Sequence, residues 1–183
     1  MIYFLTGQGG VYVRNEDVIE LLQHYRHDLM NQVQIMKGYL SMKKYDQVSH
    51  KLDELVEGFT EERKLMNLNT PEFNLWIIRF NMWHKNIRLS YNIYTDKPLK
   101  ELDKQFVSQC KQVVNSIEMS ILASELYELT IDLDENVKKI ELIITIKGYF
   151  SDKSDLIKNL NRFGEQLETN DEKICYRLLF PND

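Results

Sequence analysis

Apolar residues recur every three or four positions between residues 15 and 42, which predicts one long amphipathic helix. Asn15, followed by two acidic residues, predicts the N-cap of this helix. At 100° per residue the apolar side chains fall within a sector of about 80°, a stripe on one side of the helix. The stripe consists of Val18, Leu22, Tyr25, Leu29, Val33, Met36 and Leu40.

A second amphipathic helix follows a short basic turn. Lys43 and Lys44 suit the C-terminus of the first helix, and Asp46 suits a new N-cap. The segment from Asn67 to Pro71 ends the second helix, because the residue before a proline avoids helical geometry. So short a connection makes the two helices an antiparallel hairpin. The apolar positions of the second helix are Tyr45, Val48, Leu52, Leu55, Phe59 and Met66.

A single hairpin cannot bury both apolar stripes. The stable arrangement of such helices is a bundle of four, and this chain provides one hairpin. We therefore predict a homodimer in which two hairpins form a four-helix bundle. The alternative is a hairpin that packs on the C-terminal region of its own chain.

The remainder of the chain alternates between helical and strand patterns. Helices on one face of a small sheet would make it an α/β sandwich within an α+β protein. We predict a flexible arm at 1–14, the hairpin at 15–69 and the sandwich domain at 70–183. The expected helices are 73–86, 102–123 and 155–167, and the expected strands are 88–95, 127–133, 139–149 and 174–180.

Composition narrows the class of protein. The net charge of −5 offers no broad basic face, which argues against nucleic acid as a direct ligand. No apolar run approaches the roughly 18 residues that a membrane span requires. Cys110 and Cys175 lie far apart, which is typical of reduced thiols. We expect a cytoplasmic protein that binds neither nucleic acid nor membrane.

His27 is predicted to face solvent, about 160° around the helix from the centre of the apolar stripe. An exposed imidazole nitrogen can attack phosphorus in line and form a phosphoramidate, a step that can run in both directions. Asp28 would orient the imidazole, and Arg26 would offset phosphate charge. The alternative is that His27 is an ordinary solvated histidine.

Other residues extend this face along the helix. Gln34 and Gly38 lie within about 20° of the direction of His27, and Asn31 and Ile35 lie at one edge. A glycine inside a helix costs about 1 kcal/mol relative to alanine, and one reason to keep it is the close approach of another backbone. We call His27, Asn31, Gln34, Ile35 and Gly38 the docking strip, because their chemistry predicts a docking surface that carries a reactive group.

The segment from His24 to Asp46 resembles the phosphoacceptor hairpin of bacterial two-component signalling, most closely that of the sporulation phosphotransferases of spore-forming bacilli. The motif is Arg-His-Asp-x-Met-Asn at 26–31, followed by Gly38 and a Tyr-Asp pair at the turn. The resemblance implies that His27 is phosphorylated, with Arg26, Asp28 and Asn31 as its catalytic neighbours. It also implies two response-regulator receiver domains as partners, a donor and an acceptor, in the initiation of sporulation. Mg²⁺ would be bound by the regulator.

A similar hairpin occurs in citrate-type sensor kinases, so the C-terminal domain decides the class. Sensor kinases hold ATP with glycine-rich loops whose backbone amides reach phosphate. Here the C-terminal half has only Gly148 and Gly164, and the neighbours of Asn115 do not fit the kinase pattern. By resemblance the domain is a degenerate histidine-kinase ATPase fold without a nucleotide site. We expect no bound cofactor, and no metal, because His24 and His27 lack further ligands.

Three functions follow from these observations. The first is a relay phosphotransferase with His27 as the intermediate carrier. The second is a divergent fragment of a sensor histidine kinase, against which the missing glycine loops count. The third is a non-enzymatic dimer that binds a regulator, which requires the helix face around Gly38 but not the imidazole of His27.

Overall fold

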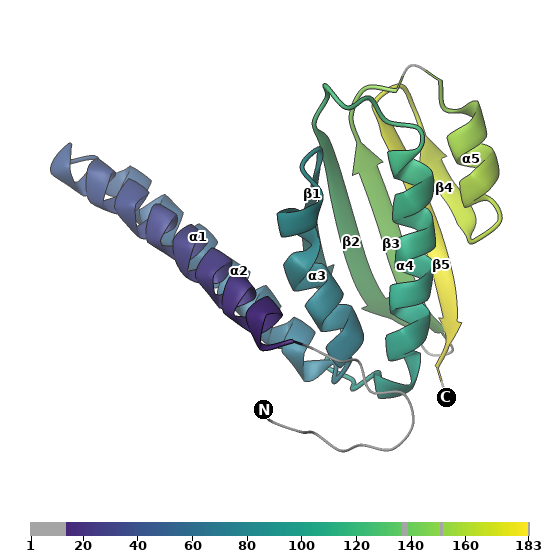
Figure 1. The fold of residues 1–183 in the computed structure, drawn as a ribbon, viewed down its shortest axis with the longest axis horizontal. Helices are drawn as coiled ribbons and strands as arrows, with labels where there is room; N and C mark the ends of the chain where they lie inside the picture. Colours follow the sequence, from purple (N-terminus) through teal and green to yellow (C-terminus); the bar gives the residue numbers. More distant parts are fainter. Residues whose placement is uncertain (1–13, 137–138, 151, 183) are drawn as a thin grey trace. The chain divides into compact units, whose positions relative to one another are not determined.

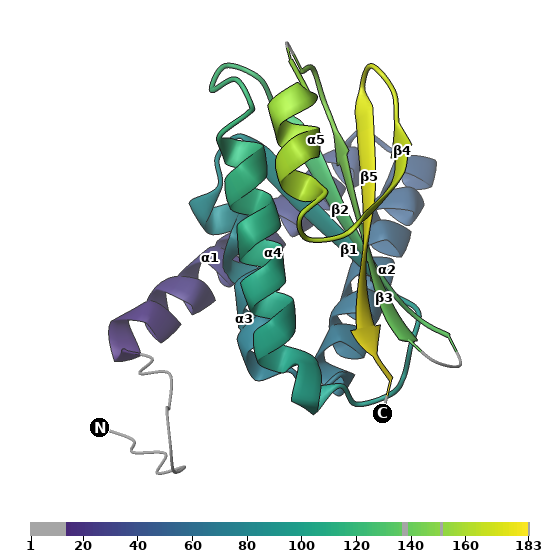
Figure 2. The same ribbon diagram turned by 90° about the vertical axis from the view of Figure 1, so that its right-hand side faces the viewer.

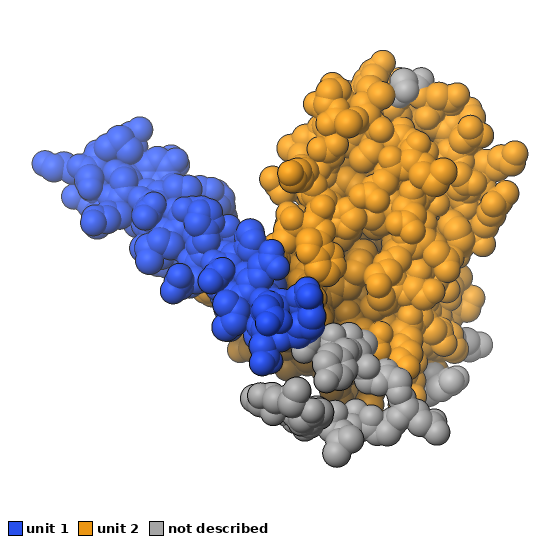
Figure 3. All heavy atoms as spheres, in the orientation of Figure 1, with its two compact units in different colours: residues 1–55 blue, residues 56–183 orange. Residues whose placement is uncertain are grey.

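The structure is a computed structural model that describes residues 14–136, 139–150 and 152–182. The predicted flexible arm at 1–14 lies outside these residues except for Arg14. The chain divides into two compact units, 1–55 and 56–183, which are coloured separately in Figure 3.

The predicted hairpin is present. Helix α1 spans Asn15–Ser41 and helix α2 spans Tyr45–Asn67 (Figure 1). A Schellman motif ends α1: Lys43 takes a left-handed φ of 57°, and the N–H of Lys44 donates to the carbonyl of Tyr39 at 2.9 Å. The basic turn predicted from the sequence is therefore a defined C-terminal cap.

Both predicted N-caps are wrong, because the helices begin earlier than the capping side chains suggested. The N-cap of α1 is Arg14, which has extended backbone geometry and a 2.9 Å ion pair with Asp17, so Asn15 is already helical. Asp46 likewise lies inside α2, which begins at Tyr45. Neither Asn15 nor Asp46 is needed as a cap.

The second unit is a five-stranded sheet with three helices on one face (Figure 2). The strand order is β1-β2-β3-β5-β4, with β1 parallel to β2 and all other neighbours antiparallel. The α+β class predicted from the sequence is confirmed. The elements are α3 (Pro71–Trp83), β1 (Ile87–Ile93), the 3-10 helix η1 (Lys100–Leu102), α4 (Asp103–Glu118), β2 (Tyr127–Glu135), β3 (Lys139–Lys147), α5 (Ser154–Leu160), β4 (Glu165–Thr169) and β5 (Lys173–Pro181).

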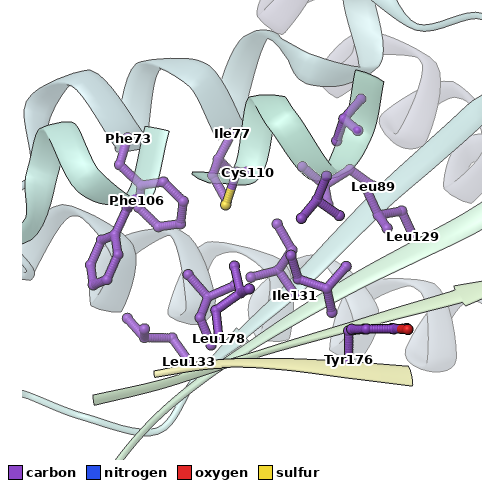
Figure 4. Close-up of a cluster of buried hydrophobic side chains, with 14 of the residues drawn as sticks. Phe73, Ile77, Leu89, Phe106, Cys110, Leu129, Ile131, Leu133, Tyr176 and Leu178 are labelled. Carbon is purple, nitrogen blue, oxygen red and sulfur yellow. The ribbon is translucent and has the colours of Figure 1, made fainter. Parts of the chain in front are cut away.

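The core lies between this sheet and the helices. Phe73 and Ile77 of α3 and Phe106 of α4 point toward the sheet, where Ile131 and Leu178 meet them (Figure 4). Alternate residues of the strands are buried, as expected when only one face of a sheet is covered. Burial of this apolar surface is the main source of stability for the second unit.

All three helices predicted for the second unit end earlier than expected, the one at 73–86 already at Trp83, and one strand was missed. The helix predicted at 155–167 stops at Leu160, and the chain turns at Gly164 into strand β4. Four of the five residues of β4 are exposed, so this edge strand has no alternating apolar pattern that could have revealed it. The helix predicted at 102–123 stops at Glu118.

Side chains protect the outer edge of strand β1. The amide of Asn81 donates to the carbonyl of Leu89 at 3.0 Å and accepts from its N–H at 2.8 Å. A carboxylate oxygen of Glu61, from α2, accepts from the N–H of Ile93 at 2.9 Å. These bonds satisfy backbone groups that an edge strand would otherwise leave open to another chain.

The end of α2 belongs to the core of the second unit. Leu65 and Leu68 are completely buried, and the carbonyl of Leu68 accepts a 2.7 Å hydrogen bond from Leu99. The units therefore divide between Leu55 and Val56, inside α2. This division lies earlier in the chain than the domain boundary between residues 69 and 70 that the sequence predicts.

Asp103 provides the N-terminal cap of a helix 30 residues earlier in the chain. Its two carboxylate oxygens accept the N–H groups of Glu72 at 3.1 Å and of Phe73 at 2.8 Å. Pro71 occupies the first turn of α3, where its missing N–H costs nothing. A buried carboxylate thus joins the start of α3 to the start of α4.

We predict that Asp103→Ala lowers the free energy of unfolding by about 1–3 kcal/mol, because it leaves two N–H groups of α3 without an acceptor. Chemical denaturation of the full chain measures the change. Asp171→Ala, at an exposed position in the turn between β4 and β5, is the matched control and should change stability by less than about 0.5 kcal/mol. Equal losses in the two variants would contradict the capping role.

Candidate functional site

His27 lies on the solvent side of α1, as the helical spacing predicts. Its side chain is 69% exposed and that of Asp28 is 74% exposed. The imidazole is therefore accessible to a molecule that binds this face of the helix, and no rearrangement of the chain is needed to reach it.

Two of the three predicted catalytic neighbours contact the ring of His27. Nδ1 lies 3.2 Å from a carboxylate oxygen of Asp28. The amide nitrogen of Asn31, one turn later, lies 3.3 Å from Nδ1 and 3.5 Å from Nε2. Among the described residues, Arg26 forms no hydrogen bond or ion pair with this ring. The structure thus brings Asp28 and Asn31 to the imidazole but not Arg26.

The Asp28 contact favours one tautomer of His27. A carboxylate only accepts hydrogen bonds, so its contact with Nδ1 places the ring proton on that nitrogen. Nε2 then carries the lone pair, and the Asn31 amide can donate only toward Nε2. The arrangement leaves a nucleophilic nitrogen with an amide donor beside it.

The rest of the docking strip is also exposed. Gln34, Ile35 and Gly38 face solvent, and Ile35 retains 49% of its accessible surface. A Cβ built on Gly38 would meet no atom within 4 Å. Packing within this chain therefore does not require a glycine at position 38, and the space beside it is open to another molecule.

Helix α2 contributes to the same region, which the sequence analysis missed. A hollow of about 310 Å³ is lined by Gln32 and Ile35 of α1 and by Lys51 and Glu54 of α2. Lys51 Nζ lies 2.5 Å from a carboxylate oxygen of Glu54, and this hydrogen bond lowers the pKa of the Glu54 carboxyl. The pairing of Lys51 with Glu54 at i, i+3 is visible in the sequence, but its position beside Ile35 is not.

The opposite side of the hairpin is an exposed apolar surface. Helix α1 has no buried residue in the single chain, although its stripe follows the spacing of a core-facing helix. The stripe residues with at least 40% of their surface exposed are Val18, Leu22, Tyr25, Val33 and Leu40. Tyr45 and Leu52 of α2 are also exposed, so apolar surface is available on both helices of the first unit.

The two glycines of the C-terminal half both pack against other atoms. Gly148 has a φ of 152°, and a Cβ there would lie 2.3 Å from the ring of Tyr127. A Cβ on Gly164 would lie 2.4 Å from the carbonyl oxygen of Arg177. Close packing explains the absence of a side chain at both positions.

No group of three or more His, Cys, Asp or Glu residues in the described ranges is arranged to hold a metal ion. Both cysteines are buried, and burial raises the pKa of the Cys110 thiol far above its ordinary value, so it stays protonated and unreactive. None of the helices built from the described residues has the length and apolar character of a membrane span.

Comparison with known proteins identifies the family. A family model for the alpha-helical domain of the sensor-kinase SpoOB type matches residues 12–68. Sporulation initiation phosphotransferase B of Bacillus subtilis (strain 168) is 30% identical over 141 residues, which cover 75% of this chain and 73% of that protein.

Two histidine-kinase structures also align, with TM-scores too low to support an inference. Histidine kinase ThkA, solved in complex with response regulator protein TrrA, gives a TM-score of 0.38 at 13% identity over 88% of this chain and 61% of that chain. Acinetobacter baumannii histidine kinase AdeS gives 0.37 at 12% identity over 85% of this chain and 97% of that chain. The identity and coverage of the Bacillus subtilis relative decide the assignment: the chain belongs to the SpoOB-type phosphotransferases of the sporulation phosphorelay.

Proposed function

We propose that His27 carries the phosphoryl group in this phosphotransferase. It accepts the group from the aspartyl phosphate of one response-regulator receiver domain and passes it to an aspartate of a second. The observation that carries this proposal is the exposed imidazole whose Nδ1 faces Asp28, which leaves the lone pair for attack on Nε2.

The transfer balances without an added proton donor. The lone pair of Nε2 attacks phosphorus in line, the N–P bond forms, and the P–O bond to the donor aspartate breaks, so that a carboxylate leaves. The ring becomes a cation that retains its proton on Nδ1, and the Asp28 carboxylate 3.2 Å away offsets the new charge. The second transfer reverses these steps with the acceptor carboxylate as nucleophile.

The neighbouring side chains have separate parts in this mechanism. The Asn31 amide, 3.5 Å from Nε2, can donate to a phosphoryl oxygen once the N–P bond forms. Arg26 contributes positive charge near the incoming phosphate rather than contact with the ring. The Mg²⁺ that phosphoryl transfer requires is assigned to the acidic site of the receiver domain and not to this chain.

The receiver domain is proposed to bind along the docking strip and the adjoining hollow. The exposed Ile35 lies on the strip and also lines the hollow, and the open space at Gly38 accepts a closely approaching partner backbone. Gln34 supplies an amide that can donate and accept. Such a mixed apolar and amide surface suits transient binding, because it holds the partner without a large permanent interface.

We also propose that two hairpins associate into a four-helix bundle. The exposed stripe supports the dimer, because contiguous apolar surface on a soluble helix is normally buried against another element. A two-fold bundle would place two copies of His27 on its outside, since the stripe and the imidazole lie on opposite sides of α1.

The central test mixes the purified chain with a phosphorus-32-labelled phospho-receiver domain. We expect acid-labile, alkali-stable label on the chain, as for phosphohistidine, and its loss in His27→Gln. His24→Gln, which changes another exposed histidine one turn earlier, is the matched control and should retain the label. Label that persists in His27→Gln would refute the assignment, and labelling of the chain by ATP alone would favour the kinase alternative.

Asp28→Asn should slow phosphoryl transfer roughly three- to tenfold, because an exposed charge-assisted hydrogen bond makes a modest contribution. The same variant should shift the tautomer equilibrium of His27 away from the Nδ1–H form, which imidazole nitrogen NMR shifts report. Asp17→Asn, on the same helix but away from His27, should change neither measurement. An unchanged tautomer ratio in Asp28→Asn would exclude the orienting role.

Leu22→Glu should raise the dissociation constant of the dimer by about a hundredfold or more, because two symmetry-related copies of a buried leucine are lost together. Analytical ultracentrifugation over a concentration series measures this constant. Gln34→Glu, on the opposite side of α1, is the control and should leave the dimer intact. A monomeric wild-type chain, or a dimer that is unaffected by Leu22→Glu, would contradict the bundle.

A further inference from the structure

We propose that a cavity on the second unit binds a small organic phosphate that carries a flat ring. The cavity is a groove open to solvent, with a volume of about 400 Å³. It lies along α4, next to the turn that follows α5, and α4 and α5 are neighbours on the same face of the sheet (Figure 2). The proposal does not depend on the role of His27, which belongs to the other unit.

The lining of the cavity is cationic and rich in amides. Two residues are cations, four are neutral hydrogen-bonding residues, one is aromatic, and none is acidic, in a chain whose net charge is −5. Such a lining favours an anionic ligand. The seven lining residues are Lys104, Gln105, Ser108, Gln109, Gln112, Arg162 and Phe163.

The acidic residues of α4 are engaged elsewhere. Asp103 caps helix α3 with both of its oxygens, and Glu118 lies 2.6 Å from Nδ1 of His84. Between these two positions α4 contains no carboxylate. Among the described residues neither Lys104 nor Arg162 forms an ion pair, so both charges are available to a ligand.

The lining residues of α4 lie on the side of the helix that faces away from the core. The lining positions from Lys104 to Gln112 recur at intervals of three and four, as expected for one face of a helix. The other face is packed against the sheet through Phe106 and Cys110, which are completely buried. The packed helix therefore holds the backbone positions of these amides at fixed intervals along the cavity.

Phe163 supplies a platform for a planar group. Its side chain is partly buried and packs against the hydrophobic core, while it also lines the cavity. A flat ring can stack on such an aromatic face, and the amides of Gln105 and Gln109 can hydrogen-bond to its edge. Gln112 is already engaged with Ser108 at 3.4 Å. Phosphate oxygens would then bind Lys104 and Arg162.

The test uses the full chain and three probes: inorganic phosphate, ribose 5-phosphate and uridine 5′-monophosphate. Isothermal titration calorimetry measures affinity, and backbone amide NMR shifts locate the site. We expect shifts at 104–112 and 162–163, and uridine 5′-monophosphate should bind about fivefold or more tightly than ribose 5-phosphate because of ring stacking. Equal affinity of the two esters, or no binding of either, would overturn the proposal.

Charge variants separate this site from general attraction of anions. Arg162→Gln and Lys104→Gln should each weaken binding of uridine 5′-monophosphate about tenfold, through loss of one charge-assisted contact. Lys111→Gln removes the same charge from α4 outside the cavity and should leave affinity unchanged, and the thermal unfolding midpoint checks that each variant is folded. Equal weakening in all three variants would show non-specific attraction and refute the site.

Discussion

The first unit depends on one geometric constraint, which is that a single helix must present two chemically opposite faces. The apolar stripe of α1 and the imidazole of His27 lie about half a turn apart, so burial of one leaves the other in water. No residue of α1 is fully buried within the single chain, and most of its stripe keeps exposed apolar surface. In the proposed association through the stripe, His27 would stay accessible without needing a pocket of its own.

The second unit holds the end of the hairpin by its own core. Leu65 and Leu68 are buried there, and Glu61 closes the backbone edge of strand β1. These contacts make the last turns of α2 part of the sheet domain and not of a linker. Helix α2 is therefore continuous across the division between the two units, with its C-terminal turns in the second.

The sequence predicted what depends on periodicity and missed what depends on tertiary contacts. The hairpin, the exposed side chain of His27 and the SpoOB-type family are all confirmed, because spacing of three and four residues and a local motif determine them. Strand β4 was missed because its exposed residues do not alternate. The hollow beside Ile35 and the cap from Asp103 to α3 join residues distant in sequence, and no local pattern reports them.

The source of the phosphoryl group explains why the second unit need not resemble an active kinase. Aspartyl phosphate and phosphohistidine have comparable transfer potential, so a relay between them requires no ATP and no loop to hold its phosphates. Glycines in such a domain are then free to serve packing, as Gly148 does against Tyr127 and Gly164 against Arg177. The helical layer can then carry a different ligand function, and the groove along α4, lined by amides and by the cations Lys104 and Arg162, is the surface on which that argument can be tested.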